Sequence, residues 1–266
     1  MLFIIALTII LNQMKLKIYL ALLVVISSLT NPLFAQKTEL LILPTIHAGH
    51  KKNVNYNFEH VRHIIENFKP DIIAVEIRPE DMNRDTNYLK ALYNPEMIMF
   101  KNEFPETEKA GIDFMGVDFE GKTLPSDFMK EIIGEFGKFR AMNQQLMRDT
   151  FIVKARIAKG LPAIITKRGE MMGNLSANQL MDGKYDALTE EFTKGQTEVL
   201  RNTPYQFYDD FQISRDQRIA DHIKTLAMKN KGKRIIVLTG ANHHNRAVNE
   251  LKKVRSVNLV TQVQDY

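Results

Sequence analysis

The sequence predicts an α/β fold in which helices flank a mostly parallel β-sheet and a helical insertion interrupts the middle of the chain. Short runs recur at Glu39–Leu43, Asp71–Val75 and Arg234–Leu238, and each is apolar throughout after one charged residue. Each has the length of a strand, and apolar residues at consecutive positions indicate burial on both faces, as in parallel sheets. An amphipathic helical pattern separates the first two runs, and this strand–helix–strand order requires parallel pairing with a right-handed crossover.

The first 35 residues differ from the rest and match a secretory signal peptide. The best match begins at Met14, with a basic start, an apolar run to Leu29 and a small-residue cleavage site ending at Ala35. Residues before Met14 would then be an upstream extension. We expect export to the periplasm or the medium and a single α/β domain over 36–266. The alternative is an uncleaved N-terminal membrane anchor that uses both apolar runs.

Charge and cysteine content exclude several kinds of partner and site. The formal charge of +5 falls to +3 when cleavage removes the two lysines Lys15 and Lys17. The basic residues are scattered, without an aromatic-interleaved basic patch, so no nucleic-acid partner is expected. The chain has no cysteine, which excludes disulfides and thiolate metal sites.

Beyond the first strand, the chain carries two histidines in Pro44–His50. Asn57 is a predicted helix cap, and apolar residues spaced three and four apart over Phe58–Phe68 predict an amphipathic helix that ends near Pro70. The second strand then leads directly into Glu76.

Residues 81–110 are predicted to be helical, with interruptions at Pro95 and Pro105. A third strand is predicted at Ile112–Val117, which would place Asp118 at its end.

The strand pattern fades over 124–211, which we interpret as a helical insertion that covers one side of the sheet. Gly160–Pro162 and Arg168–Gly169 are expected to be breaks between its helices. After the insertion, Ser214 and Gln217 fit a capping box, which would put Arg215 and Asp216 in the first turn of a helix.

The C-terminal part repeats the strand–polar pattern of the N-terminal part. The strand that begins at Arg234 runs into Gly240–His244, which is predicted to be a turn. A helix from about Asn245 to Val254 and an edge strand at Val257–Val260 are expected to follow.

Polar side chains thus follow three predicted strands: His47 and His50, Glu76, and His243 and His244. Because the carboxyl ends of parallel strands share one edge of a sheet, we expect these side chains to meet there. Neutral imidazole and carboxylate are ligands that suit zinc, manganese or cobalt. A divalent metal with an open position would lower the pKa of a bound water and polarise a carbonyl group.

Four motifs together resemble the TraB/TIKI/GumN family, within the superfamily that also holds ChaN-like and erythromycin-esterase-like proteins. They are Leu43–His47, Ala74–Glu76, Ser214–Ala220 and Thr239–His243. The resemblance extends in outline from about Glu39 to the C-terminus, and the insertion matches only in character.

The resemblance implies an exported metal-dependent hydrolase that acts on an amide (peptide) or ester bond. His47, Glu76 and His243 would be metal ligands or would position and activate the water, and Arg215 would stabilise an oxyanion or bind a substrate carboxylate. The substrate would be a peptide or small molecule bound by the insertion. Because ChaN-like relatives are associated with haem, the alternative is a non-catalytic protein that binds haem or another small ligand on the same scaffold.

Further candidate site residues lie close in sequence to the predicted strand ends and to Arg215. They are His50, Asp118, Asp216, Asn242 and His244. One residue departs from the family pattern. Pro44 stands where the first turn normally has glycine, and proline removes a backbone amide that could hold an anion. This departure leaves a third possibility, an inactive member of the family.

Overall fold

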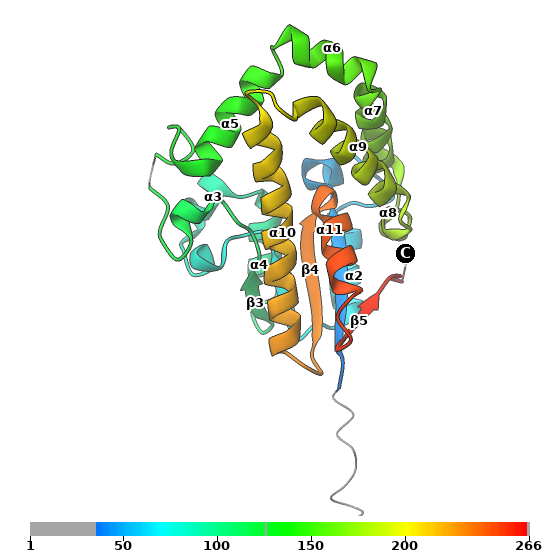
Figure 1. Ribbon diagram of the computed structural model, residues 1–266. Helices are drawn as coiled ribbons and strands as arrows, with labels where there is room; N and C mark the ends of the chain where they lie inside the picture. The colour runs from blue at the N-terminus through cyan, green and yellow to red at the C-terminus, as the bar shows by residue number, and fades with distance from the viewer. Residues whose placement is uncertain (1–35, 126, 265–266) are drawn as a thin grey trace, which may run out of the picture. The chain divides into compact units, whose positions relative to one another are not determined.

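A five-stranded, all-parallel sheet with the order β3-β2-β4-β1-β5 forms the centre of the computed structural model (Figure 1). The structure describes residues 36–125 and 127–264, so the predicted signal peptide lies outside the described residues. The strands are β1 Thr38–Thr45, β2 Ile72–Val75, β3 Glu108–Gly111, β4 Arg234–Gly240 and β5 Val257–Val260. The predicted α/β class is confirmed, as is the edge position of the last strand beside β1.

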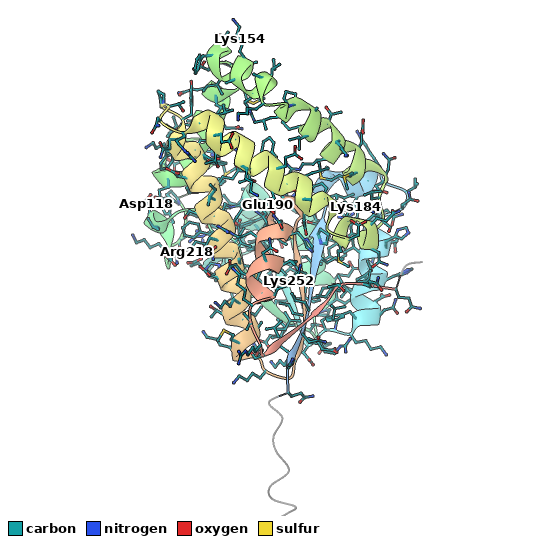
Figure 2. All side chains as sticks on the ribbon, turned by 45° about the vertical axis from the view of Figure 1, so that its right-hand side comes forward. Asp118, Lys154, Lys184, Glu190, Arg218 and Lys252 are labelled. Carbon is teal, nitrogen blue, oxygen red and sulfur yellow. The ribbon has the colours of Figure 1, made fainter. Side chains whose placement is uncertain are left out.

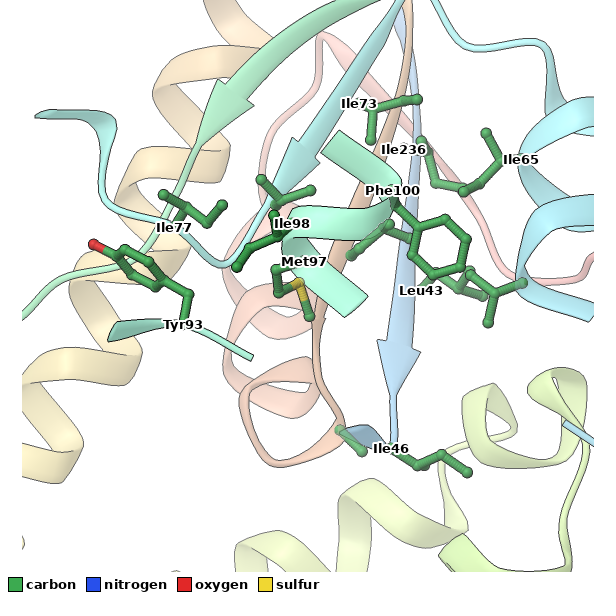
Figure 3. Close-up of a cluster of buried hydrophobic side chains, with 14 of the residues drawn as sticks. Leu43, Ile46, Ile65, Ile73, Ile77, Tyr93, Met97, Ile98, Phe100 and Ile236 are labelled. Carbon is green, nitrogen blue, oxygen red and sulfur yellow. The ribbon is translucent and has the colours of Figure 1, made fainter. Parts of the chain in front are cut away.

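Helices cover both faces of the sheet, which explains the unbroken apolar runs within its central strands. Residues such as Leu41 and Leu43 pack against α2 (Phe58–Phe68) and α4 (Pro95–Glu103), and Figure 3 shows this core. Their neighbours in sequence, such as Leu40 and Ile42, pack against α10 (Gln206–Lys229) and α11 (Ala241–Leu251). Successive strand residues point to opposite faces, so each strand contributes to two cores.

Helix α2 forms as its sequence predicts. The side chain of Asn57 caps it by accepting a hydrogen bond from the backbone nitrogen of His60. The helix ends at Phe68, where Lys69 takes a left-handed conformation with φ of 48°.

The third strand lies earlier in the chain than the predicted range Ile112–Val117. β3 ends at Gly111, and the predicted apolar run begins only at Ile112. As an edge strand, β3 has partly exposed residues such as Glu108, so it carries no apolar run for a pattern to detect. In consequence Asp113, two residues beyond β3, lies at the sheet edge, whereas Asp118 lies further along in the 3-10 turn η3 (Val117–Phe119).

The predicted interruption at Pro95 is confirmed, because one helix ends before this residue and the next begins at it. The region contains α3 (Thr86–Leu92) and α4, and Pro95 is the first residue of α4. Proline is tolerated there because the amide of a first-turn residue has no partner within the helix. Two further 3-10 turns, η1 (His47–Lys51) and η2 (Pro79–Asp81), follow β1 and β2.

The capping box at Ser214 is not formed, because α10 begins eight residues earlier at Gln206. Tyr208 and Phe211 are buried and extend the apolar stripe of the helix upstream, so the helix continues through Ser214. Arg215 therefore lies in the interior of a helix.

The junction of β4 and α11 has no loop. β4 continues to Gly240 and α11 begins at Ala241, so the predicted turn at Gly240–His244 is wrong. His243 and His244 lie in the first turn of α11, which ends at Leu251 rather than at Val254.

Five helices of the insertion form an arch beyond the carboxyl ends of the strands (Figures 1 and 2). The predicted cover of one side of the sheet is met only in part, by insertion residues such as Leu180 and Tyr185 that join the core of Leu41 and Leu43. The five helices are α5 Gly134–Leu146, α6 Thr150–Ala158, α7 Leu161–Asn174, α8 Ala177–Met181 and α9 Lys184–Leu200. Gly160 precedes α7 as expected, but Arg168 and Gly169 lie within it. A single helix-interior glycine costs only about 1 kcal/mol, which packing can outweigh. No helix of the described residues is both long and apolar enough to span a membrane.

Candidate active site

Glu76 is the centre of a cluster at the carboxyl edge of the sheet. The cluster also contains His47, Arg215 and His243 with the carboxylates that they contact. Oε2 of Glu76 accepts hydrogen bonds from the backbone nitrogen of Gly240 at 2.7 Å and from Oγ1 of Thr239 at 3.0 Å. Both donors lie at the end of the neighbouring strand β4, so strand pairing fixes the carboxylate. Burial favours the neutral acid, but the charges of His243, Arg215 and His47 hold the pKa of Glu76 well below its usual range.

Arg215 reaches this edge from α10. Its Nη2 donates to Oε1 of Glu76 at 3.2 Å and to Oδ1 of Asp113 at 2.6 Å, and its Nε donates to Asp113 and to the carbonyl oxygen of Phe114. Asp113 is buried, and burial raises its pKa against the opposing effect of Arg215. The guanidinium is therefore held in place by contacts that follow two different strands.

His243 enters from the first turn of α11. Its Nδ1 contacts Oδ1 of Asp216 at 2.6 Å, and its Nε2 lies 3.4 Å from Oε1 of Glu76 and 3.2 Å from Nη1 of Arg215. Burial lowers the pKa of His243, but the charges of Glu76 and Asp216 outweigh burial and raise that pKa to about 10. The imidazole is thus protonated at neutral pH, and its Nε2 cannot accept a proton from Arg215.

His47 approaches Glu76 from the end of β1. It has a φ of 50°, in the left-handed region, which costs roughly 1–3 kcal/mol in a residue other than glycine. Its Nδ1 contacts Oε1 of Glu96 at 2.6 Å; Nδ2 of Asn94 lies 3.1 Å from the same nitrogen, and the shorter, charged contact decides the tautomer. A Cβ atom added to Gly240 would lie 2.8 Å from His47 Nε2, so this nitrogen faces the cluster.

His47 is the most accessible member, with 37% of its side chain exposed. Burial lowers its pKa, and the contact with Glu96 and the charge of Glu76 more than compensate, so the pKa is raised above its ordinary value. An accessible imidazole whose Nδ1 is fixed by a carboxylate can exchange a proton through Nε2.

His47, Glu76 and His243 are the predicted ligands of a metal ion. Histidines whose Nδ1 atoms are held by carboxylates match the usual surroundings of metal ligands. However, the guanidinium of Arg215 lies 3.2 Å from both His243 Nε2 and Glu76 Oε1. Within the described residues, no three histidine, aspartate or glutamate side chains are arranged to hold a metal ion. The three predicted ligands therefore do not fit a metal ion unless Arg215 moves.

His50 does not join the cluster, although it is only three residues from His47. Its Nε2 accepts a hydrogen bond from the backbone nitrogen of Ile46 at 3.0 Å, and its Nδ1 donates to the carbonyl oxygen of Tyr56 at 2.7 Å. Burial lowers the pKa of His50 to about 4. This neutral, buried imidazole connects the turn after β1 to the chain before α2.

His244 and Asn242 point away from Glu76 and towards the arch. Nδ1 of His244 contacts Oδ2 of Asp186 in α9 at 2.9 Å. Oδ1 of Asn242 accepts hydrogen bonds from the hydroxyl of Tyr185 at 2.8 Å and from Nη2 of Arg168. These two residues attach α11 to α7 and α9.

Asp118 is not brought to the cluster either. Its Oδ2 accepts a hydrogen bond from the backbone nitrogen of Glu135 at the start of α5. Figure 2 shows it on the same side as Arg218, whose guanidinium pairs with Glu120. Asp118 therefore stabilises the beginning of the insertion.

Two carboxylates of the site have no local pattern in the sequence that marks them. Asp113 follows an edge strand without an apolar run, and Glu96 lies in the first turn of α4, far from His47 in sequence. A motif based on a corrected β3 boundary would have found Asp113.

A cavity of about 330 Å³ lies beside His243 and opens under the arch. From the cluster, Arg215, Asp216 and His243 line it. The rest of the lining comes mainly from α7, α9 and α10 and includes Arg168, Thr189, Phe192, Gln196, Asp209 and Gln212. A substrate in this space would contact both the cluster and the insertion.

The chain was compared with models of known protein families, with curated proteins and with solved structures, and none of them matches it. The family resemblance of the four motifs therefore stays a prediction.

Proposed function

We propose that the protein is a hydrolase that cleaves an amide or ester bond at the cluster around Glu76. One observation carries the proposal: two histidines, each bound through Nδ1 to a carboxylate, direct Nε2 towards one buried glutamate, and one of them, His243, lines a cavity. A base oriented by a third group and adjacent cationic donors are what acyl-group hydrolysis requires.

In this proposal His47 acts as the general base. A water molecule attacks the carbonyl carbon and transfers a proton to Nε2 of His47, while the imidazole keeps its contact with Glu96. The carbonyl oxygen becomes an oxyanion. When this intermediate collapses, the C–N or C–O bond breaks and the leaving nitrogen or oxygen takes the proton from His47, which releases an amine or alcohol and a carboxylic acid. Glu96 holds the ring in the tautomer that this exchange needs.

Arg215 and protonated His243 would stabilise the oxyanion. Nη1 of Arg215 and Nε2 of His243 are 3.2 Å apart, and both are donors when His243 carries its proton. Two donors this close converge on one acceptor, and both residues line the cavity. Glu76 and Asp216 keep the imidazolium charged.

The expected metal dependence stays a prediction that does not enter these steps. The test is elemental analysis of protein purified without chelators, followed by a panel of amide and ester substrates with and without added zinc, manganese or cobalt. We expect a colourless protein with turnover, and a loss of at least about 10²-fold in kcat/KM for His47→Ala. Absence of turnover together with a Soret absorption band would instead support the haem-binding alternative.

Export is a separate part of the proposal. The order of basic, apolar and small residues from Met14 to Ala35 supports removal of this segment. Mass spectrometry of the protein from an exporting host should give a mature N-terminus at Gln36. An intact Met1 in membrane-bound material would support the anchor instead.

A further inference from the structure

Arg168 carries a buried guanidinium in α7, and none of the described carboxylates pairs with it. It is 8% exposed, and its Nη2 donates to Asn242 and, at 3.4 Å, to the hydroxyl of Tyr185. Its Nε is buried without a hydrogen-bond acceptor. Across residues 36–125 and 127–264, Arg168 forms no ion pair, and its Nη1 donates to no side chain or backbone group.

Two aromatic rings hold this guanidinium in place. Its Cζ lies 5.3 Å from the ring centroid of Tyr185 and 5.2 Å from that of Phe192. Arginine stays protonated in proteins, and a buried charge without a counter-ion is strongly unfavourable. A fold that positions such a charge rigidly therefore indicates an anion that comes from outside the chain.

The cavity beside His243 is where that anion would bind, because Arg168 lines it. The other charges of the lining are compensated: Arg215 pairs with carboxylates, and Asp216 pairs with His243. Asp209 accepts hydrogen bonds from the side chains of Thr197 and Gln196, and burial raises its pKa. Arg168 is thus the cationic group of the cavity lining that has no carboxylate partner among the described residues.

Asn242 connects this guanidinium to the proposed reaction centre. Its Oδ1 accepts from Arg168, and the next residue in α11 is His243. An anion bound by Arg168 would therefore lie within one small cavity of the groups that stabilise the oxyanion.

We infer that Arg168 binds a carboxylate of the substrate, so that the bond cleaved belongs to an N-acylated amino acid or short peptide with a free carboxylate. The nature of the reaction rests on the proposed function, whereas the carboxylate site rests on Arg168 and its cavity. One guanidinium with planar donors matches one carboxylate. A cavity of about 330 Å³ has room for a ligand of this size.

Calorimetry with three matched ligands tests the inference without turnover. The ligands are N-acetyl-Ala-Ala as the free acid, its C-terminal carboxamide, and N-acetyl-glutamate carboxamide, whose carboxylate is on the side chain. We expect one of the acids to bind at least tenfold more tightly than the neutral carboxamide. The acid that binds identifies a terminal or a side-chain carboxylate.

Variants locate the site. Arg168→Gln should abolish the preference for the acid, and Arg168→Lys should retain part of it. Lys167→Gln, which removes the same charge from the adjacent exposed position of α7, should leave it unchanged. Equal affinities for acid and carboxamide in the wild-type protein, or no binding of any ligand at millimolar concentration, overturn the inference even if Arg168→Gln does not fold.

The two proposals fail in different ways. A preference for the acid that depends on Arg168, without hydrolysis of any substrate, would overturn the proposed function and leave the carboxylate site in place. Hydrolysis of acid and carboxamide substrates with equal kcat/KM would overturn the carboxylate site and leave the hydrolase.

Discussion

At the scale of single residues, the charge of Glu76 decides the protonation of its neighbours. Glu76→Gln keeps the shape and an oxygen for the backbone nitrogen of Gly240, but it removes the carboxylate 3.4 Å from His243 Nε2. We expect the pKa of His243, which is about 10, to fall by roughly 1–3 units. NMR titration of histidine-labelled, chelator-treated protein measures this shift.

The control is Glu39→Gln at the opposite end of β1, where Glu39 pairs with exposed Arg234. It should leave the titration of His243 unchanged. An unchanged pKa of His243 in Glu76→Gln would show that Asp216 alone sets it, and the role of Glu76 in the oxyanion site would be wrong.

His50 makes folding stability depend on pH. Its pKa is lowered from 6.5 to about 4, so between these values the unfolded chain binds a proton that the folded protein does not. The stabilising contribution is therefore fully present above pH 6.5 and is lost as the pH falls to about 4. The shift corresponds to about 3 kcal/mol in the free energy of unfolding.

Urea denaturation of wild-type protein and His50→Gln at several pH values from 7 to 4 checks this contribution. The variant is expected to be less stable at pH 7, because it loses hydrogen bonds, but to show a shallower decline towards acid. Parallel curves would contradict a buried neutral His50.

At the scale of elements, the loop-free junction of β4 and α11 brings Gly240 against His47. A Cβ at Gly240 would lie 2.8 Å from His47 Nε2 and 3.4 Å from Glu76 Oε2, so Gly240→Ala should displace the imidazole. The backbone φ of −55° suits alanine, so folding should be preserved. We expect kcat/KM to fall by about 10²-fold with little change in thermal stability.

The matched control is Gly169→Ala in α7, where an added Cβ meets no atom within 4 Å. It should stabilise the helix by up to about 1 kcal/mol and leave turnover unchanged. Wild-type activity in Gly240→Ala would mean that His47 does not need its present position.

The elements that could be predicted from the sequence are those whose pattern reflects their own burial. β1, β2 and β4 are apolar because helices cover them on both sides, and α2 carries its cap and stripe locally. β3 could not be located because an edge strand needs no apolar run. The start of α10 was misplaced because a cap-like Ser214 also occurs inside a helix when flanking turns are buried.

At the scale of the whole fold, strand order decides which side chains share a site. His47, Glu76 and His243 could be predicted because each follows a buried strand or begins the next helix, and parallel strands end at one edge. Glu96, Asp113 and Arg168 could not, because helix packing and the arch bring them there; the pairs that they form with the predicted residues are 49 to 102 positions apart. Local patterns contain no information on such pairs.

The arch depends on α11 for its attachment, and this gives the last prediction. Nδ1 of His244 contacts Asp186 at 2.9 Å, and both side chains are largely buried. His244→Ala leaves Asp186 without this partner, which should cost about 1–3 kcal/mol. Because α9 and α7 form one wall of the cavity, hydrogen exchange should accelerate there more than in α2.

Mass-spectrometric hydrogen exchange on His244→Ala and on Lys252→Ala, an exposed position at the end of α11 labelled in Figure 2, measures the difference. Lys252→Ala should exchange like the wild type. His244→Ala should also weaken binding of the carboxylate ligand, although His244 does not line that cavity, because Arg168 is carried by α7. If hydrogen exchange accelerated equally in α2, α7 and α9, the arch and the sheet would unfold together. The arch would then not be a separate unit of stability.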